Sequence, residues 1–177
     1  KTEYVIPPPM AGFFEFALMR TRGDIDQKLL SELYEQYITV EDDFIRQLFL
    51  NGKTQLGRVF ILEDSVSSEH ALHVLDYERA TQVIETADDI GIGLCYCRHK
   101  RQHQGKACDA EMDICMTFDT VATSLIRSDY ARRVDRGECK ELLHKAWEQN
   151  LVQFGENVRN SVSFICNCCP CCCEAMI

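Results

Sequence analysis

The sequence lacks the features that would place it in several common classes of protein. Its unbroken apolar runs are a few residues long, far short of the ~20 that a membrane-spanning helix needs, so we expect no membrane span. Acidic residues outnumber basic ones by 28 to 19, for a net charge of −9, which argues against nucleic acid as a partner. The chain has no G-x-S-x-G, H-E-x-x-H or Walker motif. We therefore predict no hydrolytic site and no catalytic residue.

Cysteine, in contrast, is abundant, with 11 residues in 177, and six of them lie between Cys166 and Cys173. A disulfide needs Cα atoms about 4.4–6.8 Å apart and converging side chains, which consecutive residues cannot all provide. Thiols concentrated at one point are typical of metal sites, so we predict a metal site here. The odd cysteine count and the absence of a secretory leader pattern favour a reducing, cytoplasmic compartment.

A second group of cysteines follows an alternating stretch, 90–97, which we expect to be one strand. Its glycines and the thiols of Cys95 and Cys97 share a face, where a bulky cofactor could approach the backbone. The two thiols would lie about 6.5–7 Å apart, a separation suited to an iron–sulfur cube, although half-buried core cysteines are the alternative. Cys108 and Cys115 bring the group to four thiols, the number that one [4Fe–4S] cluster requires. On a helix these two would lie ~10.5 Å apart, so joint binding implies an irregular turn.

Between these cysteines, residues 98–106 are briefly basic. The cations could offset the charge of a thiolate-bound cluster, form a docking patch for an acidic electron carrier, or belong to a solvated loop. His99 and His103 lie here and are alternative ligands in a mixed zinc site. His70 and His73 have no cysteine near them in sequence, and we expect them to fill the surface or core.

The predicted fold class is α+β, mostly helical with short strands and a winged-helix-like C-terminal part. Residues 1–52 are expected to form a helical N-terminal segment and 53–177 the cysteine-rich region, or both form one compact domain. Pro7-Pro8-Pro9 suits an extended linker, and the chain starts at Lys1 without a methionine, so we expect a fragment of a longer protein. Helices are predicted at about 13–18, 24–38, 41–50, 76–87, 119–128 and 135–147, and strands at 58–63 and 90–97.

Two of the predicted helices carry residues whose burial can be tested. In the helix over 24–38, Ile25, Leu29, Leu33 and Tyr37 should face the core. Cys139 lies on the apolar face of the 135–147 helix, so we expect a buried small hydrophobe rather than a ligand.

A hairpin of 151–154 and 161–165 would follow the last helix and place Cys166 at a strand end. We predict that two sheet ends bring the two cysteine groups together.

Several motifs, taken together, resemble a known family. They are Cys95-Tyr96-Cys97-Arg98-His99-Lys100, Gly105-x2-Cys108, Cys115-Met116-x-Phe118, Phe164-Ile165-Cys166-Asn167-Cys168-Cys169-x-Cys171-Cys172-Cys173 and, upstream, Pro9-x2-Gly12-Phe13-Phe14-Glu15-Phe16. The chain resembles, over nearly its whole length, a family of 4Fe–4S ferredoxin-type proteins of anaerobic bacteria and archaea. Pro170 departs from that pattern, where a small residue is expected.

The resemblance implies a cytoplasmic redox protein, with a winged-helix segment before this part and a two-cluster ferredoxin module after it. It also implies that the cofactor is held by ten cysteines: Cys95, Cys97, Cys108, Cys115, Cys166, Cys168, Cys169, Cys171, Cys172 and Cys173. Of these, all but Cys171 and Cys173 are predicted iron ligands.

We therefore predict an iron–sulfur electron-transfer protein, or a module of a larger redox protein, with one or two [4Fe–4S] clusters. Its partner would be another redox protein, and we expect an electron-transfer module more than an enzyme in its own right. One alternative is a structural or regulatory zinc-binding module. Another is a thiol redox switch or metal store, which would form reversible disulfides.

Overall fold

The computed structural model describes residues 11–40, 57–60, 77–156, 162–174 and 176. The helix predicted at 41–50, the histidines His70 and His73, and the proposed boundary at residue 52 lie outside these ranges. The division into two regions therefore stays a prediction. None of the helices in the described ranges combines the length and the apolar character needed to cross a bilayer.

One antiparallel sheet of six strands organises the described part of the chain, in the order β1-β5-β6-β3-β2-β4. The strands are β1 (Gly57–Phe60), β2 (Ile90–Leu94), β3 (Asp113–Phe118), β4 (Ala131–Arg133), β5 (Val152–Glu156) and β6 (Phe164–Cys168). The prediction of a mostly helical chain with a winged-helix-like C-terminal part is wrong. The predicted hairpin exists as β5 and β6, but β5 also pairs with β1 and β6 with β3, so the hairpin lies inside a larger sheet.

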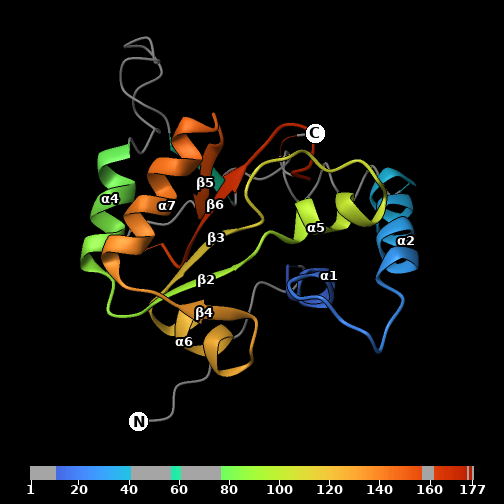
Figure 1. Cartoon of the computed structure of the whole chain (residues 1–177), viewed down its shortest axis with the longest axis horizontal. Coiled ribbons are helices and arrows are strands. Elements are labelled where there is room, and N and C mark those ends of the chain that lie inside the picture. Colours follow the sequence, from blue (N-terminus) through green and yellow to red (C-terminus); the bar gives the residue numbers. More distant parts are fainter. Residues whose placement is uncertain (1–10, 41–56, 61–76, 157–161, 175, 177) are drawn as a thin grey trace.

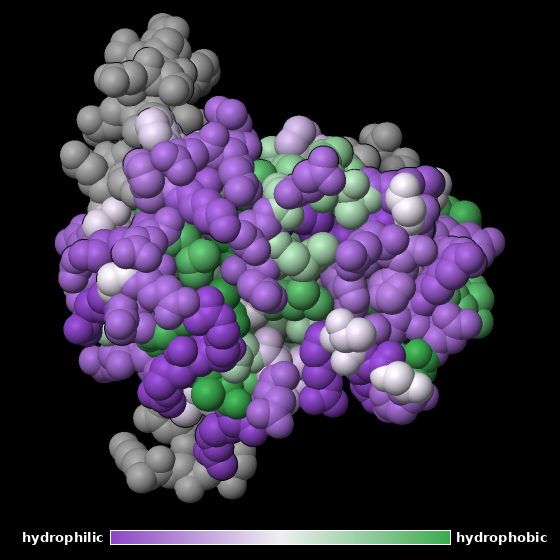
Figure 2. All heavy atoms as spheres, in the orientation of Figure 1, coloured by the Kyte–Doolittle hydropathy of each residue, from purple (hydrophilic) through white to green (hydrophobic). Residues whose placement is uncertain are grey.

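Helices cover both faces and one end of the sheet (Figure 1). They are α1 (Ala11–Leu18), α2 (Gln27–Val40), α4 (Tyr77–Thr86), α5 (Tyr96–His103), α6 (Asp119–Arg127) and α7 (Arg136–Glu148). Helices α4 and α7 pack together on one face, whereas α6 packs on β2, β3 and β4, and α5 contacts both α1 and α2. Figure 2 shows hydrophobic colours in a central band between two hydrophilic sides of the molecule.

The main apolar core lies between the sheet and the pair α4 and α7. Ile92 and Met116 from the sheet meet Ile84 of α4 and Leu143 of α7 there, and each is at most 2% exposed. The sequence Asp135-Arg136-Gly137-Glu138 matches the capping box, and Asp135 caps α7 by accepting a hydrogen bond from the Glu138 N–H at 2.9 Å. Cys139 is fully buried in this core, which confirms its prediction as a small hydrophobe.

The glycine face of β2 is occupied by protein rather than left open for a cofactor. A Cβ at Gly91 would lie 2.9 Å from Thr117 Oγ1 and 3.2 Å from Ala131 Cβ, so the close approach of β3 and β4 accounts for this glycine. The predicted strand is also too long, because it ends at Leu94 and Cys95 begins α5 as its N-cap residue. The alternation therefore does not extend to the two cysteines.

Helix α2 buries the face opposite to the predicted one. Leu29 and Leu33 are 51% and 52% exposed, and Tyr37 is also exposed, whereas Gln27 and Ser31 are buried. The Gln27 side chain donates to the carbonyls of Ala17 and Arg20, and the Ser31 hydroxyl donates to the Gln27 carbonyl. The buried face of α2 is therefore polar, and its side chains are tolerated there because they form hydrogen bonds with backbone carbonyls.

Candidate metal centre

Ten of the eleven cysteines gather at one end of the sheet, around the start of α5 and the C-terminal segment (Figure 1). They come from α5 and the residue before it, from β3 and β6, from the loop before β3, and from the turn after β6. The prediction that the two cysteine groups of the sequence meet is therefore confirmed. The exception is Cys139 in the apolar core.

Four of these thiols form a compact set, which we call the four-thiol group: Cys108, Cys169, Cys171 and Cys172. Their Sγ atoms all lie within 4.8 Å of one another, and this set could hold a metal ion. The Sγ of Cys108 is 3.5 Å from that of Cys169 and 3.9 Å from that of Cys172, which is 3.7 Å from that of Cys171. Four thiolates around one tetrahedral ion, with metal–sulfur bonds near 2.3 Å, lie ~3.8 Å apart.

A tight turn after β6 shapes the four-thiol group. The N–H groups of Cys172 and Cys173 both donate to the carbonyl of Cys169, which folds the terminal segment back past Pro170. Cys169 and Cys172 are buried, Cys108 is partly buried and Cys171 is exposed. The group thus has one side at the surface.

The other six thiols form a closed chain of side-chain contacts, which we call the six-thiol ring. In order around the ring they are Cys95, Cys97, Cys173, Cys168, Cys166 and Cys115. The Sγ atoms of Cys173 and Cys168 lie 3.3 Å apart. Each thiol in the ring therefore neighbours two others, in a largely buried position.

The two groups differ from isolated thiols in their proton affinity. Hydrogen bonds from the thiols of Cys115 and Cys97 lower the pKa of Cys95 well below its usual value, and the positive charge of Arg98 adds to this. Burial opposes ionisation of Cys108, but the Ala110 N–H and the neighbouring thiols outweigh it and lower the pKa to about 7. Each group therefore contains at least one thiol disposed to the thiolate form that binds metal.

Arg98 is a charged side chain in direct contact with these thiols. It is fully buried, and it donates to the carbonyls of Glu111 at 2.5 Å and Asn167 at 3.0 Å and to the Sγ of Cys169 at 3.7 Å. Burial lowers its pKa, but the thiols of Cys95, Cys169 and Cys108 outweigh this and raise it. Among the described residues its Nε has no hydrogen-bond partner.

Residues 98–103 of the basic segment belong to α5, and three of their cations are buried, so the alternative of a solvated loop is wrong for this part. Lys100 is fully buried, forms ion pairs with Glu35 at 2.7 Å and with Glu174, and lies 4.9 Å from the centre of the Tyr34 ring. Arg101 is also buried and pairs with Glu35 at 2.7 Å. Carboxylate partners allow these cations to be buried.

His99 and His103 lie beside each other and outside the four-thiol group. Their Nε2 atoms are 3.1 Å apart, and the Nδ1 of His99 is 2.7 Å from the carbonyl oxygen of Leu18. Their role as zinc ligands stays a prediction, as do the individual ligand roles of the cysteines.

Sequence reasoning missed Asn167 as a residue that positions the site. Its buried side chain donates to the Ile114 carbonyl at 2.8 Å and accepts from Gln153 at 3.1 Å. The backbone carbonyl of Asn167 accepts a hydrogen bond from Arg98. Asn167 thereby links β6 to β3 and β5 between two cysteines of the ring. A polar residue between cysteines on a strand is the only sequence signal.

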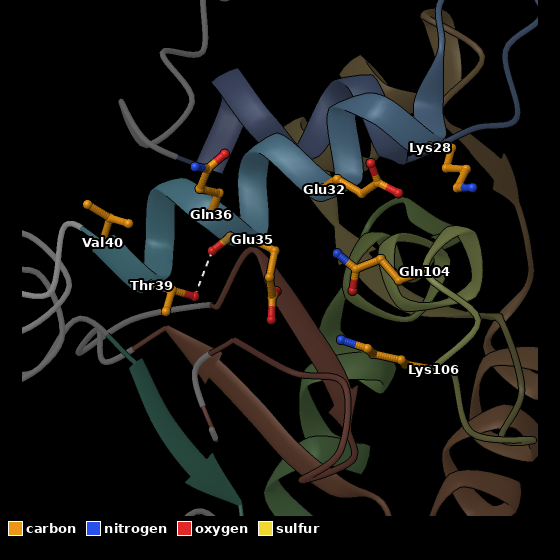
Figure 3. Close-up of a pocket in the computed structure, with 8 residues that line it drawn as sticks. All are labelled: Lys28, Glu32, Glu35, Gln36, Thr39, Val40, Gln104 and Lys106. Atoms are coloured by element: carbon orange, nitrogen blue, oxygen red, sulfur yellow. Dashed lines mark hydrogen bonds between the residues drawn. The ribbon is translucent and has the colours of Figure 1, made fainter.

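A polar groove of about 520 Å³ lies elsewhere, between α2 and the end of α5 (Figure 3). It is lined by Lys28, Glu32, Glu35, Gln36, Thr39, Val40, Gln104 and Lys106. None of the described residues that line it is a cysteine or histidine, and charges of both signs face one another across it.

Comparison with known proteins gives no assignment. No protein-family model matches the chain, and no curated protein or solved structure matches it. The resemblance to ferredoxin-type proteins stays a prediction, and the identity of the site rests on its own geometry.

Proposed function

We propose that the chain binds an iron–sulfur centre of the [4Fe–4S] type through its clustered cysteines and transfers electrons to another redox protein. The observation that carries this proposal is the number of thiols that meet. A single structural metal ion takes four ligands, whereas ten thiols gather here and six of them form one ring. Sites with this surplus suit a centre of several metal atoms.

The residues around the thiols fit such a group. Thiolates are the soft ligands that iron–sulfur clusters take. The unpartnered Nε–H of Arg98 is a buried donor that a cluster sulfide could accept from. The start of α5, at Cys95, directs the positive end of a helix dipole toward the ring. When bound, the cluster would supply reversible one-electron chemistry.

The chain's own contribution is to hold and shield the centre. Six of the ten clustered thiols are buried, which limits the access of water, and Arg98 offsets their negative charge. Cys171 is exposed, so the four-thiol group has a side that a transiently docked redox partner could approach.

A second candidate is a structural or regulatory zinc site at the four-thiol group. Its Sγ separations of 3.5, 3.7 and 3.9 Å match the ~3.8 Å of a single tetrahedral ion. Thiolates on a [4Fe–4S] cube lie roughly 6 Å apart, since each binds a different iron. These separations favour a single ion at the four-thiol group. The ring has six thiols, which is more than the four ligands that one tetrahedral ion takes.

The test is to purify the protein without oxygen and to measure iron, zinc and acid-labile sulfide per chain. Electron paramagnetic resonance before and after dithionite then reports on redox activity. We expect iron with a comparable amount of sulfide and a signal that appears or disappears on reduction. Zinc without sulfide or signal would contradict the electron-transfer proposal and support the second candidate.

A further inference from the structure

Arg98 contacts the four-thiol group through Cys169, and through the backbone carbonyl of Asn167 it contacts β6 between two cysteines of the six-thiol ring. We propose that these groups are two separate metal sites that share Arg98, a positioning residue whose buried charge stabilises the thiolates of both. This inference rests on the proposed function only in that the thiols bind metal, of whichever kind.

The terminal segment distributes its thiols between the two sites. Cys168 and Cys169 are adjacent, yet the Sγ of Cys168 lies 3.3 Å from that of Cys173 in the ring, whereas the Sγ of Cys169 lies 3.5 Å from that of Cys108. Consecutive side chains of extended backbone point to opposite sides. Cys172 and Cys173 divide in the same way, toward Cys108 and Cys168.

The surroundings of the two groups also differ. Cys169 and Cys172 pack with Ile114, Ala146 and Leu151. The ring packs in a different apolar cluster, with Tyr96, Phe154 and Met176. Because each group of thiols packs against its own set of apolar side chains, two separate metal sites are favoured over one continuous site.

Arg98 reaches both sets from one fixed position. Its guanidinium donates to the Sγ of Cys169 of the four-thiol group and to the backbone carbonyl of Asn167, which is flanked by the ring cysteines Cys166 and Cys168. The guanidinium of Arg98 is held in place by hydrogen bonds to the backbone carbonyls of Glu111 and Asn167. A rigid guanidinium of this kind loses little freedom when it binds.

Charge balance distinguishes Arg98 from the neighbouring buried cations. Lys100 and Arg101 are neutralised by Glu35 and Glu174. Within the described ranges Arg98 forms no ion pair with a carboxylate, so its charge remains to balance thiolates. In a buried site of low dielectric such an uncompensated cation acts strongly on anions nearby.

The test compares Arg98→Met and Arg98→Lys with Arg101→Met, a matched control that removes a buried charge three residues away. Each whole chain is purified without oxygen, checked for folding by circular dichroism, and mixed with a chelator while metal release is followed. We expect release from Arg98→Met to be at least tenfold faster than from wild type, with Arg98→Lys clearly slower than Arg98→Met and Arg101→Met close to wild type. For an iron centre we also expect Arg98→Met to lower the reduction potential, because removal of a buried positive charge disfavours the added electron.

Two cysteine variants test whether the sites are separate. Cys108→Ser should lose the metal of the four-thiol group and keep that of the ring, and Cys173→Ser should do the reverse. Loss of all metal in both variants would show a single site. If Arg98→Met behaved like Arg101→Met, or Arg98→Lys like Arg98→Met, the charge role of Arg98 would be wrong. Zinc in place of iron would overturn the proposed function alone, because the release comparison applies to either metal.

Discussion

Cys139 and Cys172 are both buried, but they lie in regions of opposite character. Cys139 packs among the apolar side chains of α4, α7 and the sheet, where burial and the nearby Glu138 raise its pKa to about 12. Cys172 lies with three other thiols at the edge of a region that also contains Arg98. Burial raises the pKa of Cys172 as well. The two regions therefore differ in the convergence of thiols beside Arg98, which creates a place for metal, and not in the protonation of these two cysteines.

The largest effect should come from removing a thiol in each region. Cys172→Ser is expected to abolish metal binding at the four-thiol group, because a hydroxyl is a poor substitute for a soft thiolate ligand. Cys139→Ser should keep its full metal content and lose only stability. Metal analysis of both anaerobically purified variants checks this, and equal metal loss in both would remove the distinction between the regions.

The apolar core should determine stability without determining metal content. Leu143 is fully buried in α7, so Leu143→Ala should lower the free energy of unfolding by about 2–5 kcal/mol. Leu29→Ala, on the exposed face of α2, is the control and should change it by less than about 1 kcal/mol. Denaturant unfolding measures both values. A large cost at Leu29 would mean that the exposed face of α2 is covered in solution.

A pH effect should come from Glu15, which lies on α1 near the thiol ring. Burial raises its pKa to about 7 from an ordinary 4.5, although a hydrogen bond with Tyr96 opposes this and Cys95 adds to it. The folded state therefore holds this proton more tightly than the unfolded state. Its contribution to stability is complete below about pH 4.5 and is lost as the pH rises through 7.

Comparison of wild type with Glu15→Gln isolates this effect, because the thiols titrate in both. Between pH 5 and 8 the wild type should lose about 2–3 kcal/mol of unfolding free energy relative to Glu15→Gln. Parallel stability curves for the two proteins would contradict the raised pKa.

The smallest effect should come from the cap of α7, far from the thiols. Asp135→Ala removes the side-chain acceptor of the Glu138 N–H and should cost about 1 kcal/mol. Thermal unfolding measures this cost, while metal content should stay unchanged. A change in metal content would show that the core and the thiol region are coupled through α7.

Local signals predicted the elements of the core better than their assembly. The capping pattern at Asp135 and the apolar spacing of α4 and α7 depend on neighbours in sequence, and the structure contains both helices. Strand β3 was missed, although Ile114, Met116 and Phe118 alternate into the core, because the spacing of Cys108 and Cys115 suggested a turn or helix. Sheet order depends on pairing between distant segments, which composition does not encode.

The gathering of cysteines was predictable, but their division into two groups was not. That division depends on which way Cys168 and Cys169 point at one turn, a matter of backbone geometry. The burial of Arg98 and Lys100 was also hidden, since a run of basic residues is ordinarily solvated. Their partners, among them Glu35, Glu174 and Cys169, lie far away in sequence.

X-ray absorption spectroscopy of the anaerobically purified protein, at the iron and zinc edges, tests the central claim most directly. The account predicts an iron edge with sulfur neighbours alone and a second distance between iron atoms. A zinc edge alone, or a metal bound mainly through nitrogen and oxygen, would contradict an iron–sulfur centre held by these thiols.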